Sequence, residues 1–219
     1  MTRVLLATRN AKKLAELRRI LAPQLPDVDV VGLDDAPAYP EVRETGASFA
    51  ENALLKAHAG FSHTGLLTVA DDSGLAVDAL NGMPGVLSAR WAGGHGDDRA
   101  NLRLVVDQLR DTPDSRLGAA FVCTVALVGP GFETTVDGRM DGRLIRTPRG
   151  ANGFGYDPIF VPEGYDVTSA ELDSARKDTI SHRGRALRAL LPVLVERLGV
   201  QSPGDVRRAG GPATVAPPT

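Results

Sequence analysis

Apolar and polar positions follow two different periods along the first half of the chain. Residues 4–7 form a short apolar run typical of a strand, and residues 28–33 form a second one. Between them, residues 11–21 place leucines at helical spacing on one face, which predicts a helix with Asn10 as its N-cap. A capping box opens a further predicted helix at residues 48–63.

The second half mixes apolar runs with amphipathic segments. The expected elements are a buried strand at 66–70 with extended chain at 75–80, a helix at 98–109, a hairpin at 119–128 and 132–136, strands at 143–145 and 159–161, short helical turns at 168–172 and 175–179, and a helix from Ser181 to Leu198. Pro192 falls inside the last helix, which predicts a kink or a break there. Residues 201–219 are rich in proline, glycine and alanine, and we expect them to be disordered.

Composition narrows the class of protein. A chain of 219 residues is long enough for one sizeable core or for one domain with two lobes. The formal net charge of -2 gives no overall attraction to a nucleic acid polymer, and no apolar run approaches a membrane span. The first residues are too short for a signal h-region, and the single cysteine, Cys123, sits in an apolar run. We therefore expect a cytoplasmic protein that binds neither nucleic acid polymers nor membranes.

Two adjacent carboxylates, Asp71 and Asp72, follow the apolar run at 66–70 and precede Ser73 and Gly74. Open α/β sheets bind ligands outside the carboxyl ends of their strands, where paired acids suit a divalent metal or one metal ligand beside a general base. The alternative is an ordinary turn, because Asp, Ser and Gly are common turn formers. Taken alone, this stretch favours the turn.

The first strand and helix enclose a polar turn, Thr8 to Asn10, with Lys12 and Lys13 in the first helical turn. Free backbone N–H groups and ammonium charges at that point form an anion-binding arrangement. The alternative is a plain strand–helix unit with solvated lysines. Lysines at a helix N-terminus oppose the macrodipole, which favours a functional reason for them. The arrangement is not a Walker loop, because the G-x-x-x-x-G-K-[ST] pattern is absent.

A glycine-rich loop at residues 150–158 carries aromatic side chains. Glycines beside Phe154 would let a flat purine approach the backbone and stack on the ring. The alternative is a glycine-rich turn with Phe154 in the core. Further on, Ser181 caps a helix whose first turn is basic, a placement that the helix dipole again disfavours unless an anion or a base lies there.

Five separated motifs, in order, carry a resemblance that spans roughly residues 3 to 198. They are Thr8-Arg9-Asn10-Ala11-Lys12-Lys13, Glu44-Thr45-Gly46 with Glu51-Asn52-Ala53 and Lys56, Asp71-Asp72-Ser73-Gly74-Leu75, Gly153-Phe154-Gly155-Tyr156-Asp157-Pro158, and Ser181-His182-Arg183-Gly184. Together they resemble the inosine triphosphate pyrophosphatases, which hydrolyse non-standard purine nucleotides. Arg9 departs from the family pattern, where glycine is common, and could alter the conformation of its loop.

The resemblance implies an α/β fold with an elongated mixed central sheet flanked by helices, and two lobes around an active-site cleft. It implies one two-lobed domain over residues 1–200, followed by the tail at 201–219, and usually a homodimer. The implied activity is Mg²⁺-dependent hydrolysis of ITP, dITP or XTP to the monophosphate and pyrophosphate.

The resemblance also implies roles for individual residues. Glu44 and Asp72 are the expected metal ligands, and Asp72 is also the expected general base. The expected nucleotide contacts are Thr8, Arg9, Asn10, Ala11, Lys12, Lys13, Lys56, Ser73, Phe154, Gly155, Tyr156, Asp157, Lys177, His182 and Arg183. N–H groups of His182, Arg183 and the backbone of residues 153–157 would donate hydrogen bonds to a 6-keto oxygen, and they would oppose the amino group of ATP.

Two other functions are compatible with parts of the pattern. A catalytically silent nucleotide-binding module is one, although the presence of both Glu44 and Asp72 argues against it. A Maf-type pyrophosphatase that acts on other modified nucleotides is the second. The motifs at residues 153–158 and 181–184 do not match that type.

Overall fold

A computed structural model gives the fold of residues 2–199. One six-stranded mixed sheet has the order β2-β1-β3-β4-β5-β6, with parallel pairing among its first three strands and antiparallel pairing among the others. The strands are β1 (Thr2–Leu6), β2 (Val28–Val31), β3 (Leu67–Val77), β4 (Gly118–Gly129), β5 (Phe132–Leu144) and β6 (Phe160–Pro162). The expected tail at 201–219 lies outside the described residues.

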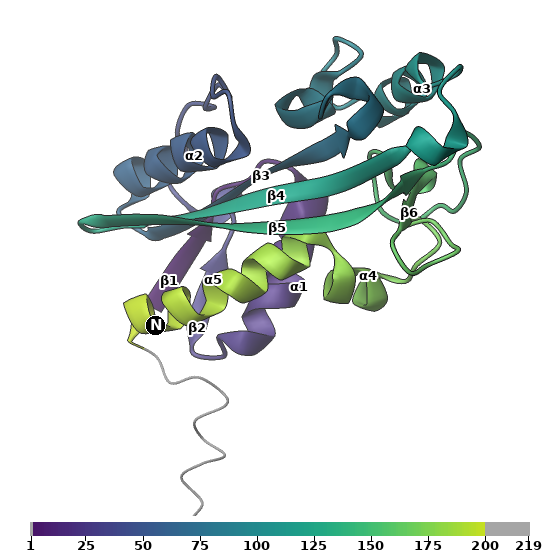
Figure 1. The fold of residues 1–219 in the computed structure, drawn as a ribbon. Coiled ribbons are helices and arrows are strands. Elements are labelled where there is room, and N and C mark those ends of the chain that lie inside the picture. Colours follow the sequence, from purple (N-terminus) through teal and green to yellow (C-terminus); the bar gives the residue numbers. More distant parts are fainter. Residues whose placement is uncertain (1, 200–219) are drawn as a thin grey trace, which may run out of the picture.

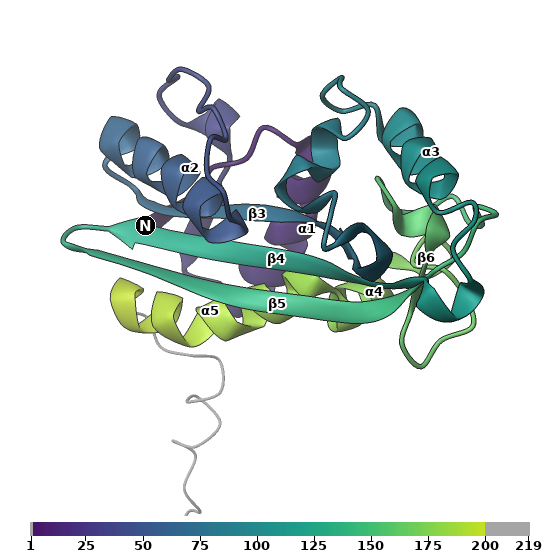
Figure 2. The same ribbon diagram turned by 45° about the horizontal axis from the view of Figure 1, so that its top comes forward.

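Helices cover both faces of this sheet (Figures 1 and 2). They are α1 (Ala11–Leu21), α2 (Phe49–Thr64), α3 (Asp98–Gln108), α4 (Ser174–Ile180) and α5 (His182–Leu198), with a 3₁₀ helix η4 (Gly85–Arg90) before α3. Helices α1 and α5 share a core on one face, whereas α2 packs on the opposite face of β3 and β4. A third core, which includes Val105 of α3, lies toward the other end of the long strands. The elongated mixed sheet flanked by helices confirms the expected fold class.

Local signals begin and end the helices as expected. The Asn10 side chain accepts hydrogen bonds from the backbone N–H groups of Lys12 and Lys13, which caps α1. Ser48 accepts from Glu51 N–H at the start of α2, and Gly65 ends that helix with a φ of 70°. Glycine is suited to this left-handed position because it has no Cβ. These contacts fix the start of α1 and both ends of α2, two of the helices that contribute residues to the site.

Two expected breaks in the sheet are wrong. Asp71 and Asp72 do not follow the end of a strand, because β3 continues through them and pairs with β4 from Thr68 to Val77. Likewise, residues 132–136 and 143–144, expected to lie in separate strands, belong to the single strand β5, and Ile145 lies just beyond its end. Turn-forming residues such as Asp stay extended here because the long neighbouring strand satisfies their backbone hydrogen bonds.

Two helical predictions also need correction. Residues 168–172 form a non-helical turn, not the short helical segment that was expected. Helix α5 continues through Pro192, so the break that was one of the two expected outcomes does not occur, and the kink stays a prediction. Pro192 lies on the exposed side of α5, and the buried leucines Leu187, Leu190 and Leu194 on the other side hold the helix against the sheet. That packing outweighs one lost backbone hydrogen bond.

No helix within residues 2–199 is long and apolar enough to cross a membrane.

Candidate active site

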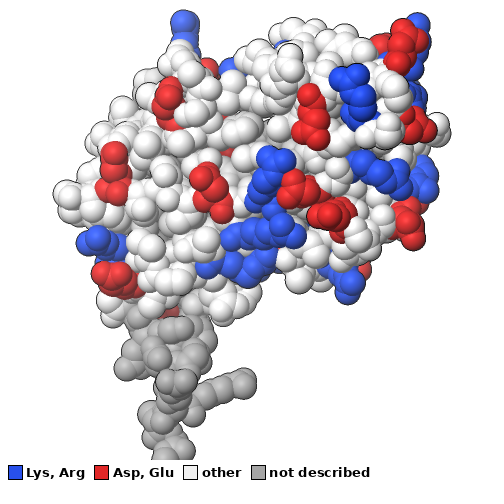
Figure 3. Space-filling view, in the orientation of Figure 1, with Lys and Arg blue, Asp and Glu red and all other residues white. Residues whose placement is uncertain are grey.

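A cavity of about 660 Å³ opens between the loop before α2, the segment around η4, the turn before α1 and the start of α5. Fifteen residues expected from the sequence line it: Thr8, Arg9, Asn10, Lys13, Glu44, Lys56, Asp72, Ser73, Phe154, Gly155, Tyr156, Asp157, Lys177, His182 and Arg183. Ala11 and Lys12 do not line it. Lys12 lies near its rim, with its Nζ 3.8 Å from Oδ2 of Asp98, which does line the cavity. In the view of Figure 3, lysine and arginine side chains gather near the middle of the visible surface beside acidic ones.

Asp72 points from β3 toward α2 and is almost fully buried. Its Oδ2 accepts a hydrogen bond from Asn52 Nδ2 at 3.0 Å, and its Oδ1 lies 3.6 Å from Lys56 Nζ. Burial raises the pKa of Asp72 above its ordinary value, against the opposing charges of Lys56 and Lys13. A buried carboxylate with a raised pKa at a cavity wall is suited to accepting a proton.

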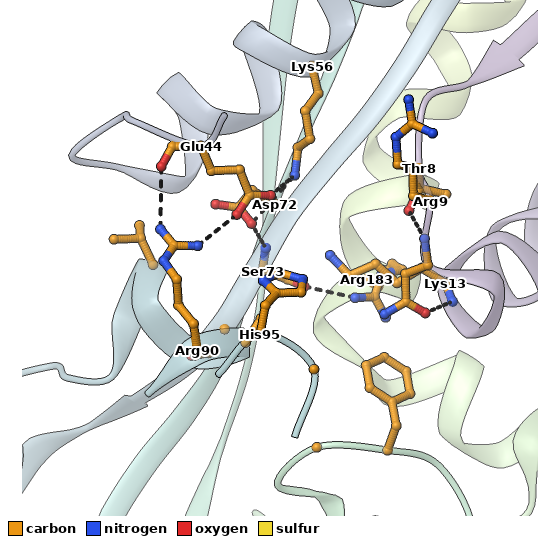
Figure 4. Close-up of a pocket in the computed structure, with 18 of the residues that line it drawn as sticks. Thr8, Arg9, Lys13, Glu44, Lys56, Asp72, Ser73, Arg90, His95 and Arg183 are labelled. Carbon is orange, nitrogen blue, oxygen red and sulfur yellow. Dashed lines mark hydrogen bonds and ion pairs between the residues drawn. The ribbon is translucent and has the colours of Figure 1, made fainter. Parts of the chain in front are cut away.

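Glu44 is held on both of its oxygens by cations (Figure 4). Oε1 accepts from Lys56 Nζ at 2.8 Å, and Oε2 accepts from Arg90 Nη1 at 3.1 Å. Burial alone would raise the pKa of Glu44, but the charge of Lys56 and the hydrogen bonds from Lys56 and Arg90 hold that pKa below its ordinary value. Lys56 therefore bridges the carboxylates of Glu44 and Asp72.

Asp71 belongs to a separate ion network on the opposite face of β3. Its Oδ2 lies 3.1 Å from Lys13 Nζ and accepts from Arg183 Nε at 3.1 Å. Arg183 also donates to Glu16 at 2.6 Å and to Ser73 Oγ at 2.8 Å. Burial alone would raise the pKa of Asp71, but Lys13, Arg183 and Lys56 hold it far below its ordinary value. Asp71 thus stays ionised and joins β3 to α1 and α5.

The glycine-rich loop brings Phe154 to the cavity among three cations. The ring centroid lies 5.7 Å from Lys12 Nζ, 5.5 Å from Lys177 Nζ and 5.8 Å from the Arg183 guanidinium carbon. The expected alternative, Phe154 tucked into the core, is wrong, because the ring lines the cavity and is only partly buried. Phe154 is therefore placed where a flat ring can stack.

Many of the donors expected to read a base are already occupied. The backbone N–H of Phe154 donates to Asp157, and that of Gly155 donates to Asp98. The Arg183 side chain is 2% exposed, and all three of its nitrogens donate to protein oxygens. A base-reading role for Arg183 stays a prediction. Its three protein contacts indicate that Arg183 also stabilises the fold.

His182 remains a candidate for contact with a base. Its ring stacks on Phe121, with centroids 4.9 Å apart. Burial, together with the charges of Arg183 and Lys177, holds the pKa of His182 well below its usual value. The imidazole is therefore neutral at pH 7, and its buried Nδ1 has no partner within residues 2–199.

The residues fit a magnesium ion that is shared with a phosphate ligand. No group of three or more His, Cys, Asp or Glu side chains within residues 2–199 could by itself enclose a metal. Glu44 and Asp72 nevertheless both line the cavity and share Lys56. Mg²⁺ needs only one or two carboxylates when phosphates and waters complete its ligands. The donor set is therefore suited to a metal that enters with a phosphorylated substrate.

Sequence reasoning missed several residues of the site. Asn52 is fully buried and joins Asp72 to the loop, because its Oδ1 accepts from Gly46 N–H at 2.8 Å. The signal for Asn52 was its position four residues before Lys56, which puts both on one helix face. Arg90 and Glu16 were also missed, and no local pattern marks either one, because each is defined by a partner far along the chain.

The cavity of this mixed α/β fold carries acidic and basic side chains and presents an aromatic ring. These features are suited to binding a phosphorylated ring compound. The chain belongs to the Ham1 family, whose sequence profile matches residues 4–193. A dITP/XTP pyrophosphatase of Nocardia farcinica (strain IFM 10152) is 65% identical over 196 residues, covering 89% of this chain and 95% of the relative. The enzyme of the same name from Streptomyces coelicolor is 58% identical over 200 residues, covering 91% and 100%.

Solved structures agree. A crystal structure of a nucleoside-triphosphatase, or dITP/XTP pyrophosphatase, from Mycobacterium abscessus has a TM-score of 0.72 and 62% identity, covering 87% of this chain and 100% of that one. A Ham1 protein from Coxiella burnetii has a TM-score of 0.81 and 40% identity, covering 90% and 100%. The resemblance drawn from the five motifs is confirmed.

Proposed function

We propose that this chain is a Mg²⁺-dependent pyrophosphatase that converts dITP, XTP and ITP to the monophosphate and pyrophosphate. The names of its relatives support this substrate class. The observation that carries the chemistry is the buried Asp72 carboxylate, whose pKa is raised and which shares Lys56 with Glu44 at the wall of the cavity.

Glu44 and Asp72 would hold the metal. When bound, Mg²⁺ would offset phosphate charge and polarise phosphoryl oxygens. Asn52 and Lys56 orient the Asp72 carboxylate, and Arg90 and Lys56 orient that of Glu44. Both carboxylates are thus fixed before the substrate arrives.

In the proposed reaction, Asp72 takes a proton from a water molecule as that water attacks the α-phosphorus. The new bond joins the water oxygen to phosphorus, and the bond between the α-phosphorus and its bridging oxygen to the β-phosphate breaks. Pyrophosphate leaves with the bridging oxygen, and the nucleoside monophosphate keeps the oxygen from water.

Cations on the cavity wall would offset the charge that develops on pyrophosphate. The side chains of Lys13 and Lys56 are 14% and 16% exposed, so their charges act in a partly desolvated site. Burial lowers the pKa of Lys56, but the carboxylates of Asp72, Asp71 and Glu44 outweigh it and raise that pKa, which keeps the ammonium charged. Fixed charges interact more strongly with a developing negative charge in a low-dielectric site than in water.

At the other end of the cavity, Phe154 would stack on the purine and neutral His182 would contact its edge. An apolar pocket of the right shape separates similar bases by only about 1–3 kcal/mol, whereas a buried polar group that loses its partner discriminates more strongly. The Nδ1 of His182, which has no partner within residues 2–199, supports such a polar contact.

The resemblance also supports a cytoplasmic homodimer. Sedimentation equilibrium of the full chain tests the dimer, because a monomer at all concentrations would contradict it.

A nucleotide panel tests the proposed activity directly. Purified protein is incubated with dITP, XTP, ITP, dATP, ATP and GTP, and pyrophosphate and phosphate are measured separately. We expect pyrophosphate with matching monophosphate from the first three, and slow turnover of the others. Release of single phosphates, or equal rates on ATP, would contradict the proposal.

A further inference from the structure

The segment that carries Glu44 has no regular secondary structure. Residues 36–48 form neither helix nor strand, yet residues 41–45 line the cavity. A loop without its own backbone ladder is positioned by its tertiary contacts. Those contacts therefore decide where the Glu44 carboxylate lies.

The second half of this segment, residues 44–48, is anchored on α2 and η4, whereas residues 36–43 form its first half. Glu44 pairs with Lys56 and Arg90. The Gly46 N–H donates to Asn52 Oδ1, and the Ala47 N–H donates to Glu51 Oε2, both at 2.8 Å. These contacts hold this half on α2 and η4, and the position of Glu44 still depends on how the first half of the segment leads into it.

The first half is attached through Tyr39. Arg9 Nη2 donates to the Tyr39 carbonyl oxygen at 2.9 Å, and the Tyr39 ring stacks on His63 with centroids 4.9 Å apart. Arg9 belongs to the turn before α1, next to the Asn10 cap, and in Figure 4 it lies across the cavity from Glu44. One exposed guanidinium therefore joins this turn to the loop.

The backbone at position 9 does not need the glycine that the family signature commonly has there. Within residues 2–199, Asn81 alone among non-glycine residues has a positive φ, so Arg9 occupies an ordinary conformation. The neighbouring Asn10 still caps α1. Arginine at this position adds a contact to the loop without straining the turn.

We propose that Arg9 is a positioning residue that clasps the Glu44 loop against the turn before α1, and so presets the metal side of the cavity. This inference rests on the proposed function for its kinetic consequence only. Without the guanidinium, the first half of the loop opens more often, and Glu44 occupies its place for less of the time. An enzyme with a less populated competent state needs more ligand for the same occupancy.

Limited proteolysis tests the clasp without any activity measurement. Trypsin cleaves after Arg43, which is exposed within this loop. We expect Arg9→Ala to raise the initial rate of cleavage after Arg43 in ligand-free enzyme by roughly threefold to tenfold, the scale of one ordinary hydrogen bond lost at an exposed position. The matched control is Arg103→Ala on α3, whose side chain is 83% exposed. Equal cleavage rates in Arg9→Ala and wild type would overturn the clasp.

Kinetics then separate a clasp from a direct phosphate contact. A clasp raises the Mg²⁺ concentration for half-maximal dITP hydrolysis in Arg9→Ala by a larger factor than it lowers kcat, and Arg9→Lys, which keeps a charged donor, recovers part of the shift. A rise in KM for dITP at saturating Mg²⁺, with unchanged cleavage after Arg43, would overturn the proposal. If the wild type releases no pyrophosphate from dITP, the proposed function fails, and the proteolysis result still decides the clasp.

Discussion

Asp71 and Asp72 are neighbours in β3, yet their carboxylates lie on opposite faces of the sheet and their pKa values are shifted in opposite directions. Asp71 meets Lys13 and Arg183 of α1 and α5, whereas Asp72 meets Asn52 of α2. Successive side chains of a strand point to opposite faces. The pKa of Asp71 is lowered and that of Asp72 is raised, so Asp71 is suited to structure and Asp72 to proton transfer.

Asp72→Asn is expected to lower turnover of dITP by at least about two orders of magnitude, the usual scale for loss of a general base. Because the folded pKa of Asp72 is raised, its ionised form costs stability once the pH rises through that pKa. The variant should therefore unfold at the same or a higher temperature than wild type at pH 7. Near-normal turnover would contradict the assignment.

Asp71→Asn, unlike Asp72→Asn, should mainly lower the stability of the fold. The lowered pKa of Asp71 means that its stabilisation is present above the ordinary carboxyl pKa of about 3.9 and is lost as the pH falls below it. We expect lower stability at pH 7, and a weaker fall in unfolding free energy between about pH 5 and pH 3. Urea unfolding at a series of pH values measures both, and an unchanged pH dependence contradicts this role.

Arg183→Ala would leave Asp71 and Glu16 buried without their shared guanidinium. Breaking a buried pair by removing one partner typically costs about 3–5 kcal/mol. We expect that loss in urea unfolding, with lower turnover of both dITP and ATP. The control is Arg185→Ala, an exposed residue on the same helix. A stable variant that loses only dITP turnover would instead assign Arg183 to base recognition.

Chelation by EDTA should abolish activity, and added Mg²⁺ should restore it. Glu44→Gln should raise the Mg²⁺ concentration for half-maximal rate, because a neutral amide is a weaker ligand for a hard cation. Glu163→Gln, at an exposed glutamate after β6, serves as the control. Full activity in chelator would show that Glu44 and Asp72 serve another purpose.

Gly74→Ala tests the packing that presents Arg90. An added Cβ at Gly74 would lie 2.3 Å from the Gly85 carbonyl oxygen and 2.4 Å from Ser88 Oγ, so η4 would have to shift. Overpacking of this kind costs about 1–3 kcal/mol. We expect lower stability and, because Arg90 positions Glu44, a higher Mg²⁺ concentration for half-maximal rate. Gly94→Ala, where a Cβ meets nothing within 4 Å, should be neutral in the same thermal and kinetic assays.

The sequence by itself determined most of the helices and the composition of the site. Leucine spacing and caps such as Asn10 and Ser48 act within one or two helical turns, so local pattern suffices to find α1 and α2. The family resemblance that the five motifs carry named fifteen of the residues that line the cavity, including Lys177, which lies outside the motifs. Their chemistry is visible in the residue types alone.

Tertiary structure decided the rest. Only pairing with β4 shows that Asp71 and Asp72 lie within a strand, since their residue types favour a turn. Likewise, Arg183 finds Glu16 and Asp71 across 167 and 112 positions of chain, and Arg9 finds Tyr39 across 30. Such partners are set by how the sheet and helices pack. Burial raises the pKa of both carboxyls, but the cations packed around Asp71 outweigh it and lower that pKa, whereas burial prevails at Asp72.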